Sequence, residues 1–184
     1  MIENLGQVEL LVADKTGTLT MNELILKEIY ADNSLIKISH GQGRNTTNSG
    51  QKVKSEIDLD SLVMVRNVIQ HSSDEMAHHL FFCMTVCHSA VVSRIKSESS
   101  RGFISESEDE LALLDAAKQI GFTFFKRTDT EIYVRAFKDE AVFTIKGIFP
   151  YDPVRRMMSI IVETRSGETI MYSKGADSSM FPLC

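Results

Sequence analysis

Apolar residues recur at two different spacings along the chain, one typical of helices and the other of strands. In the middle of the chain the spacing is helical, with apolar side chains on one face of each predicted segment. It predicts three helices, over residues 58–70, residues 73 to about 90, and residues 107–120. Ser107 followed three positions later by Glu110 has the capping-box pattern that begins a helix, and Gly121 fits the position just past a helix end.

Beyond Gly121, short β-rich segments separated by turn signals replace the helical pattern. The predicted strands cover residues 122–125, 132–134, 141–149, 158–163 and 168–172. Ser166-Gly167 is a hairpin-turn sequence between the last two. Because no long helices separate these strands, we expect an antiparallel sheet and an α+β fold, with helices packed on one face of the sheet. Two further strands, 24–30 and 35–38, are predicted to pair with each other.

Composition excludes several classes of protein. A formal net charge of −5 and a pI of about 5.5 make the chain a poor candidate for binding nucleic acid. No stretch approaches the roughly 20 apolar residues that span a bilayer, and the first residues do not have the pattern of a signal peptide. Three cysteines, an odd number, favour a reducing compartment over a disulfide scaffold. Cys83 and Cys87, with histidines nearby, are interpreted as buried thiols in preference to metal ligands.

The clearest chemistry lies near the start of the chain. Val8 to Val12 is an apolar run that predicts a buried strand, and Asp14 follows at its carboxyl end. A carboxylate in that position can attack phosphorus as a nucleophile. The glycine and threonines that follow, up to Thr20, can hold the oxygens of the transferred phosphoryl group with backbone and hydroxyl groups.

Asp14 to Thr20, Asp-Lys-Thr-Gly-Thr-Leu-Thr, matches the phosphorylation signature of P-type ATPases at every position. Leu5 to Glu9 resembles the run that precedes this signature in the type IV, phospholipid-transporting subfamily. The resemblance implies that Asp14 is the phosphorylated nucleophile and that Asp14 and Thr16 bind Mg²⁺, Thr16 through its backbone carbonyl while it also contacts the phosphate. Phosphatases of the parent haloacid dehalogenase superfamily carry an acid–base aspartate at the position of Thr16. A threonine there implies a phosphoenzyme that persists, as a pump requires.

Two later segments resemble parts of the nucleotide-binding domain of the same subfamily. Ser107 to Leu113 matches a segment that places Glu110 near the adenine amino group, although the residues alone favour a role for Glu110 as a helix cap. Lys174-Gly175-Ala176-Asp177 matches a strand end at which Lys174 lines the nucleotide pocket. Gly175 there lets the backbone approach the ligand closely.

A third segment, from Phe149 to Ser159, resembles the adenine-stacking region of that domain. The resemblance implies that Tyr151 stacks on adenine, where the family usually has phenylalanine. Phe149 is the fallback, since two positions along a strand bring a side chain back to the same side. Arg156 is assigned to the phosphates, because its planar guanidinium suits phosphate oxygens.

The resemblance therefore implies the cytosolic, ATP-binding part of an ATP-driven phospholipid translocase. Residues 1–22 are expected to begin the phosphorylation domain with a strand of the haloacid-dehalogenase-like fold, and residues 23–184 to form a nucleotide-binding domain that is incomplete at its C-terminus. ATP and Mg²⁺ are the expected cofactors. The Gly-Asp-Gly-x-x-Asn-Asp segment that supplies Mg²⁺ carboxylates in the family is absent, so we expect the chain to bind nucleotide without hydrolysing it.

The implied partners are ATP, a phospholipid handled by transmembrane helices outside this sequence, and a membrane accessory subunit of the full-length protein. The full-length protein is expected in a membrane, with this soluble part on the cytosolic face. An ion-transporting P-type ATPase is one alternative, which the subfamily-like segments disfavour. A non-catalytic nucleotide-binding module is another, which the presence of Asp14 and Lys174 disfavours, and a simple phosphatase is disfavoured by Thr16.

Overall fold

A computed structural model describes most of the chain. The described residues are 9–10, 12–15, 18–20, 24–31, 34–41, 56–71, 76–93 and 102–183. Thr16 lies outside these ranges, so its expected role receives no structural account.

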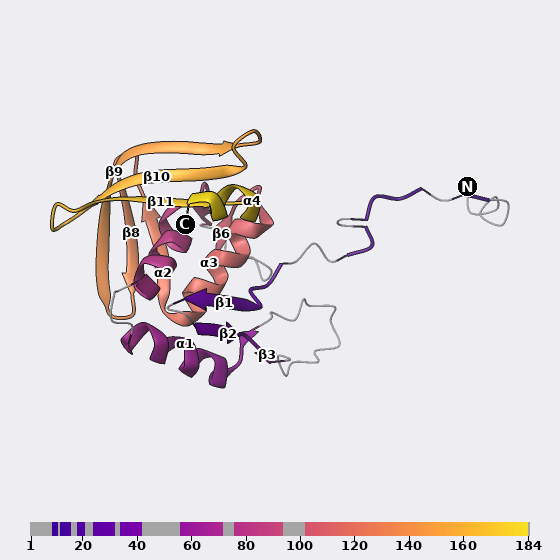
Figure 1. The fold of residues 1–184 in the computed structure, drawn as a ribbon, viewed down its shortest axis with the longest axis horizontal. Helices are drawn as coiled ribbons and strands as arrows, with labels where there is room; N and C mark the ends of the chain where they lie inside the picture. The colour runs from indigo at the N-terminus through magenta and orange to yellow at the C-terminus, as the bar shows by residue number, and fades with distance from the viewer. Residues whose placement is uncertain are drawn as a thin grey trace.

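A five-stranded antiparallel sheet forms one layer of the fold (Figure 1). Its strands are β7 (Phe122–Arg127), β8 (Glu131–Ala136), β9 (Asp139–Asp152), β10 (Met157–Thr164) and β11 (Thr169–Gly175). They run in the order β11-β10-β9-β8-β7, so each strand pairs with its sequence neighbour. The turn at Gly167, which has a φ of 85°, connects β10 to β11 as the sequence predicts. The predicted antiparallel sheet and the α+β class are confirmed.

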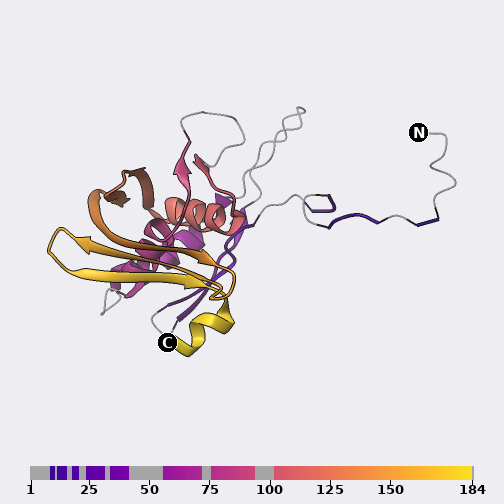
Figure 2. The same cartoon turned by 90° about the horizontal axis from the view of Figure 1, so that it is seen from above.

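Helices form the second layer. The described helices are α1 (Leu59–His71), α2 (Met76–Val86), α3 (Glu108–Ile120) and the short α4 (Asp177–Met180), which continues into a 3₁₀ turn over Phe181–Leu183. Figure 2 shows α2 and α3 within the curve of the long strands. The three long helices begin and end within a few residues of the predicted bounds.

Three small two-stranded sheets complete the described fold. They pair β1 (Glu28–Ala31) with β2 (Ser34–Lys37), β3 (His40–Gly41) with β4 (Glu56–Ile57), and β5 (Val91–Val92) with β6 (Phe103–Ile104). In the first of them, Ile29 and Ile36 are paired and buried, while their neighbours Tyr30 and Leu35 are exposed. This alternation is what a half-buried hairpin requires, and it confirms the predicted pairing of this part of the chain.

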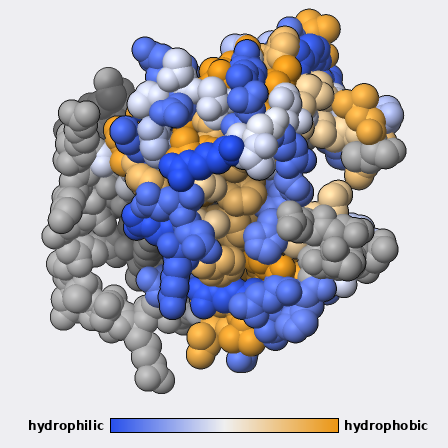
Figure 3. All heavy atoms as spheres, turned by 90° about the vertical axis from the view of Figure 1, so that its left-hand side faces the viewer, coloured by the Kyte–Doolittle hydropathy of each residue, from blue (hydrophilic) through white to orange (hydrophobic). Residues whose placement is uncertain are grey.

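The core lies between the helices and the sheet. Phe122, at the start of β7, stacks on Phe81 of α2 with ring centroids 5.2 Å apart, and Phe82 meets its edge at 5.4 Å. Met158 and Ile160 of β10 are buried beneath the same helical layer, because alternate residues of the strand face it. Hydrophilic side chains cover most of the face drawn in Figure 3, with apolar ones between them near its centre. No helix in the described part of the chain has the length and apolar character needed to cross a membrane.

The strand expected over Val8 to Val12 is not formed by the residues of that run which the structure describes. Leu10 and Val12 have no strand assignment and are 80% and 85% exposed. A strand needs neighbours for its backbone hydrogen bonds and a layer to cover its apolar face, and none of the described strands pairs with this segment. The apolar run alone does not supply either requirement, which is why the local pattern was misleading.

Candidate functional site

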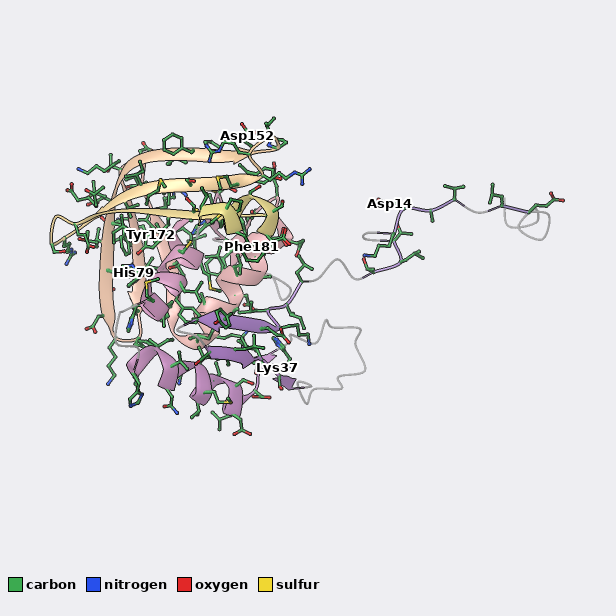
Figure 4. All side chains as sticks on the ribbon, viewed as in Figure 1. Asp14, Lys37, His79, Asp152, Tyr172 and Phe181 are labelled. Atoms are coloured by element: carbon green, nitrogen blue, oxygen red, sulfur yellow. The ribbon has the colours of Figure 1, made fainter. Side chains whose placement is uncertain are left out.

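The sequence-predicted site residues fall into separate groups in space. Asp14 is exposed, on the extended N-terminal segment, and Figure 4 shows it well away from the helices and the sheet. The structure therefore does not bring Asp14 together with the residues expected to bind nucleotide. Those residues lie on α3 and at the ends of the strands β9, β10 and β11.

Glu110 and Lys174 meet, although 64 positions separate them in the sequence. Glu110 stands in the first turn of α3, and Lys174 stands near the end of β11. The Lys174 Nζ donates to Glu110 Oε1 at 2.8 Å. The Glu110 side chain is 5% exposed and that of Lys174 is 24% exposed, so the pair connects the core with the surface.

Two serines that sequence reasoning missed also bind the Glu110 carboxylate. Ser89, just beyond α2, donates its backbone N–H to both oxygens at 3.1 Å and its hydroxyl to Oε2 at 2.9 Å. The Ser105 hydroxyl donates to Oε2 at 2.7 Å. No local pattern predicts the Ser89 contact, because Ser89 and Glu110 belong to different elements that only the tertiary fold brings together.

Ser107 begins α3 as predicted, and its hydroxyl accepts a hydrogen bond from the Glu110 N–H at 3.4 Å. The reciprocal half of the capping box is not formed. The Ser107 N–H donates to the Ser105 hydroxyl, and the Glu110 carboxylate turns inward to Lys174 and the serines. The backbone N–H of Glu110 thus takes part in capping the helix, whereas its carboxylate binds Lys174 and the two serines.

The donors around Glu110 determine its charge. Burial by itself raises the pKa of this carboxyl, but the hydrogen bonds from Lys174 and Ser105, the charge of Lys174 and the bond from Ser89 outweigh burial. Together they lower the pKa of Glu110 from 4.5 to about 2. Glu110 is therefore a buried, ionised carboxylate at neutral pH.

The two cysteines near this pair are bound by strand carbonyls. The Cys83 thiol donates to the Ser173 carbonyl, and the Cys87 thiol donates to the carbonyls of Met158 and Tyr172, all at 3.6 Å. Among the described residues there is no group of three or more His, Cys, Asp or Glu side chains that could hold a metal ion. Cys87 is buried, as expected for a core thiol, whereas Cys83 is only partly buried.

The strand register separates Phe149 from Tyr151. Phe149 stands opposite Ser159, which in turn stands opposite Ser173, and the two serine hydroxyls are 2.8 Å apart. Ser173 and Lys174 are consecutive in β11, so their side chains point to opposite faces of the sheet. Phe149 therefore shares a face with Ser159 and Ser173, and Lys174 lies on the other face.

A β-bulge places Tyr151 in a different row. Asp152 stands opposite Met157 and Phe149 opposite Ser159, so Pro150 and Tyr151 together face the single residue Met158. Met158 is also the partner of Lys174 on the other side of β10. Tyr151, Met158 and Lys174 thus form one row across three strands. The expectation that Phe149 and Tyr151 share a side fails, because the extra residue breaks the alternation.

The turn between β9 and β10 fixes the two arginines differently. Arg155 reaches the face of the sheet that carries Phe149 and Ser159. Its guanidinium lies 5.9 Å from the centre of the Phe149 ring and 3.5 Å from the Ser159 hydroxyl. Arg156 has a φ of 54°, and its carbonyl accepts the N–H of Ala176 at 3.0 Å. A Cβ at Gly175 would lie 2.6 Å from that carbonyl oxygen. Gly175 is therefore required by the packing of this turn against the end of β11.

Comparison with known proteins gives a consistent result. The family model "P-type ATPase, cytoplasmic domain N" matches residues 76–184. Phospholipid-transporting ATPase IH of Mus musculus is 33% identical over 191 residues, which cover 98% of this chain and 16% of the mouse protein. Probable phospholipid-transporting ATPase 11 of Arabidopsis thaliana is 30% identical over 204 residues, covering 97% of this chain and 17% of the plant protein. The chain spans about a sixth of the length of these relatives.

An antiparallel sheet with helices on one face, and a match over residues 76–184, define the class: the chain belongs to the P-type ATPase family and contains its cytoplasmic domain N. The relatives above, together with Phospholipid-transporting ATPase IC of Homo sapiens at 28% identity over 97% of this chain and 15% of that protein, are named as phospholipid-transporting ATPases. The expected resemblance to the type IV subfamily is confirmed.

Proposed function

We propose that this chain is the ATP-binding part of an ATP-driven phospholipid translocase. The observation that carries the proposal is the 2.8 Å contact between Glu110 and Lys174, two residues assigned to the nucleotide pocket from separate motifs. The names of the relatives support a phospholipid as the substrate of the whole protein.

In this proposal the row of Tyr151, Met158 and Lys174 is the floor of the adenine site. Tyr151, which is 63% exposed, offers its ring face to the base, and Lys174 offers its charge to the phosphates. Its membership of the Lys174 row favours Tyr151 over Phe149 for stacking. Gly175 allows the backbone to approach the ligand, and Arg156 gives a second positive charge for the phosphates.

The remaining chemistry belongs to the whole protein. We assign residues 1–22 to the start of the phosphorylation domain and residues 23–184 to the nucleotide-binding domain. Asp14 then accepts the γ-phosphoryl group of ATP as an aspartyl phosphate, and Asp14 and Thr16 are the ligands of this chain for Mg²⁺, which would neutralise phosphate charge. Asp14 is a carboxylate and fits a hard cation; the structure does not describe the Thr16 carbonyl.

The substrate is a phospholipid, moved by membrane helices that this sequence does not contain, with an accessory subunit as a further partner. This part of the chain then lies on the cytosolic side of the membrane.

Isothermal titration calorimetry with ATP tests the nucleotide site. We expect Lys174→Ala and Tyr151→Ala to weaken ATP binding about tenfold each, because each removes a direct contact. Lys146→Ala is the matched control, since Lys146 pairs with Glu163 on the sheet surface and has no place in the proposed site. Phe149→Ala should weaken binding less than Tyr151→Ala. Equal affinity of the parent chain and the Lys174→Ala variant would remove the proposal's main support.

A further inference from the structure

Cys83 and Cys87 lie one helical turn apart at the end of α2, and the proposed nucleotide site uses neither of them. The Cys87 N–H donates to the Cys83 carbonyl at 2.9 Å, so the two side chains leave the same face of this turn. Their thiols donate to consecutive carbonyls of β11, that of Cys83 to Ser173 and that of Cys87 to Tyr172. Two sulfurs that can act as nucleophiles are therefore neighbours beside one strand end.

The two thiols differ in access and in acidity. Cys83 is partly exposed, whereas Cys87 is 0% exposed. Hydrogen bonding between the two side chains raises the pKa of the Cys83 thiol, and burial raises it further. The same hydrogen bonding lowers the pKa of the Cys87 thiol, with burial opposing this effect and the charge of Lys174 adding to it. Access thus makes Cys83 the sulfur that a dissolved reagent meets first, and acidity favours Cys87 as the thiolate that attacks afterwards.

We propose that Cys83 and Cys87 form a site of reversible oxidation, at which a low-molecular-mass disulfide such as oxidised glutathione converts the two thiols into one disulfide bond. The proposal does not depend on nucleotide binding. First, the Cys83 thiolate attacks one glutathione sulfur, which gives a mixed disulfide and releases one glutathione thiolate. The Cys87 thiolate then attacks the Cys83 sulfur and displaces the second glutathione. The two thiols have lost two protons and two electrons, and the glutathione disulfide has gained them.

The helical turn strains the product and thereby makes the oxidation reversible. Side chains four positions apart on a helix have Cβ atoms about 5–6 Å apart, whereas a disulfide requires about 3.5–4.5 Å. The turn must loosen when the bond forms, and it lies where loosening costs least, because α2 ends at Val86. A strained disulfide is more easily reduced, so reduced glutathione can restore the thiols. The pair therefore suits transient oxidation in a reducing compartment.

Oxidation also removes hydrogen bonds that join the end of α2 to the sheet. A disulfide has no S–H group, so the carbonyls of Ser173, Tyr172 and Met158 lose the donors that the two thiols supply. Ser173 directly precedes Lys174 in β11. The modification should therefore loosen the strand end that carries Lys174.

The first experiment incubates the folded, reduced chain with excess oxidised glutathione and no denaturant, and maps the products by mass spectrometry. Trypsin releases both cysteines in one peptide, residues 67–94, because no lysine or arginine divides it. We expect an internal disulfide in this peptide of the parent chain and of the control Cys184→Ser, and we expect reduced glutathione to reverse it. Cys87→Ser should accumulate a glutathione adduct on Cys83, and Cys83→Ser should form neither product in this peptide.

Two results would overturn the proposal. One is the absence of an internal disulfide in the parent peptide while the chain stays folded, a result that needs no variant. The other is a disulfide that forms only through global unfolding. Urea at concentrations that leave the chain folded accelerates any reaction through the unfolded state, so we expect an unchanged rate, and a rate that rises with the population of unfolded chain contradicts reaction in the folded state.

Hydrogen exchange tests the effect of oxidation on the strand. We expect the amides of residues 172–175 to exchange about fivefold faster in the oxidised chain, as the loss of about one hydrogen bond would produce, and to return to the original rate after reduction. The hairpin of β1 and β2, residues 28–37, is the internal control and should not change. Unchanged exchange at residues 172–175 in a chain shown to be oxidised would overturn the link to the strand end.

Discussion

At the scale of single residues, the fold stabilises one buried negative charge with donors from three parts of the chain. Glu110 is 5% exposed, and Lys174, Ser89 and Ser105 bind its carboxylate. The motifs singled out Glu110 and Lys174 as candidates, and no sequence pattern singled out the two serines that contact Glu110. The reason is physical: a motif records which residues recur, whereas a hydrogen bond between two elements depends on how those elements pack.

Removing Lys174 should destabilise the folded chain as well as weaken nucleotide binding. Lys174→Ala removes the one cation that hydrogen-bonds the Glu110 carboxylate among the described residues, and we expect a loss of about 1–3 kcal/mol in the free energy of unfolding. The control Lys146→Ala breaks an exposed pair and should change that free energy by less than about 0.5 kcal/mol. Urea denaturation at pH 7 measures both. Equal effects of the two variants would show that the Glu110–Lys174 pair contributes no special stability.

His88 predicts a dependence of stability on pH. It is 1% exposed, and burial lowers its pKa from 6.5 to about 4 even though the charge of Glu110 acts in the opposite direction. Because the folded-state pKa is below the unfolded one, the neutral ring stabilises the fold above pH 6.5. This stabilisation, roughly 2–3 kcal/mol, is lost as the pH falls from 6.5 to 4.

The measurement is urea denaturation at pH 7 and at pH 5, in the parent chain and in two variants. His88→Gln should abolish most of the difference in unfolding free energy between the two pH values. His71→Gln should leave it intact, since His71 is exposed and its hydrogen bond to the Asn67 carbonyl lies within its own helix. A parent chain with the same stability at both pH values would contradict the assignment of a buried, neutral His88.

At the scale of elements, α3 shows what local pattern can establish. Ser107 and Gly121 predicted both of its ends, because a helix end requires particular backbone conformations and capping groups. Residues 8–12 show what a local pattern cannot establish. Its apolar run predicted a strand, but a strand's stability depends on partners elsewhere, and the described residues supply none. The bulge at Pro150 and Tyr151 was not predicted either, although Pro150 carried a signal for it, since a proline inside a strand with neighbours on both sides is accommodated at a bulge.

Two constraints favour glycine at position 121, a positive φ and the closeness of the Phe137 ring, and comparison with Gly167 separates their effects. Its φ is 131°, and a Cβ there would lie 2.7 Å from the ring of Phe137. Gly167 also has a positive φ, 85°, but a Cβ would meet nothing within 4 Å. Gly121→Ala should therefore lower the unfolding free energy by about 2–4 kcal/mol and Gly167→Ala by about 1 kcal/mol. Thermal or urea unfolding measures both, and equal losses would mean that Phe137 moves aside without cost.

At the scale of the whole molecule, the sequence predicted the layers better than the site. Periods of apolar residues and turn residues are local, and they sufficed for the helices, the meander of β7 to β11 and the α+β class. The relative placement of the site residues depends on register, and there the prediction that Phe149 and Tyr151 share a side was wrong. The position of Asp14 relative to Lys174 depends on a domain arrangement that no local pattern encodes.

The proposal also predicts that nucleotide binding and turnover are separate in this chain. The 184-residue sequence has no Gly-Asp-Gly-x-x-Asn-Asp segment, and Asp14 lies away from Glu110 and Lys174 (Figure 4). We expect no release of phosphate from Mg·ATP above the buffer blank, because phosphoryl transfer requires the nucleophile, metal and phosphates to be held together. A coupled phosphate assay measures it, with Asp14→Asn as the control. Hydrolysis that this substitution abolishes would contradict the prediction.

In the proposed function, the folded chain binds ATP beside the Glu110–Lys174 pair. Titration of ATP into the ¹⁵N-labelled chain, followed by amide chemical shifts, tests it most directly. We expect saturable shifts that cluster at Ser89, Ser105, Glu110, Tyr151 and Lys174. They should be lost in Lys174→Ala, while the Lys146→Ala spectrum responds as that of the parent chain does. Saturable shifts centred on other residues, or no shifts at millimolar ATP in a folded sample, would contradict it.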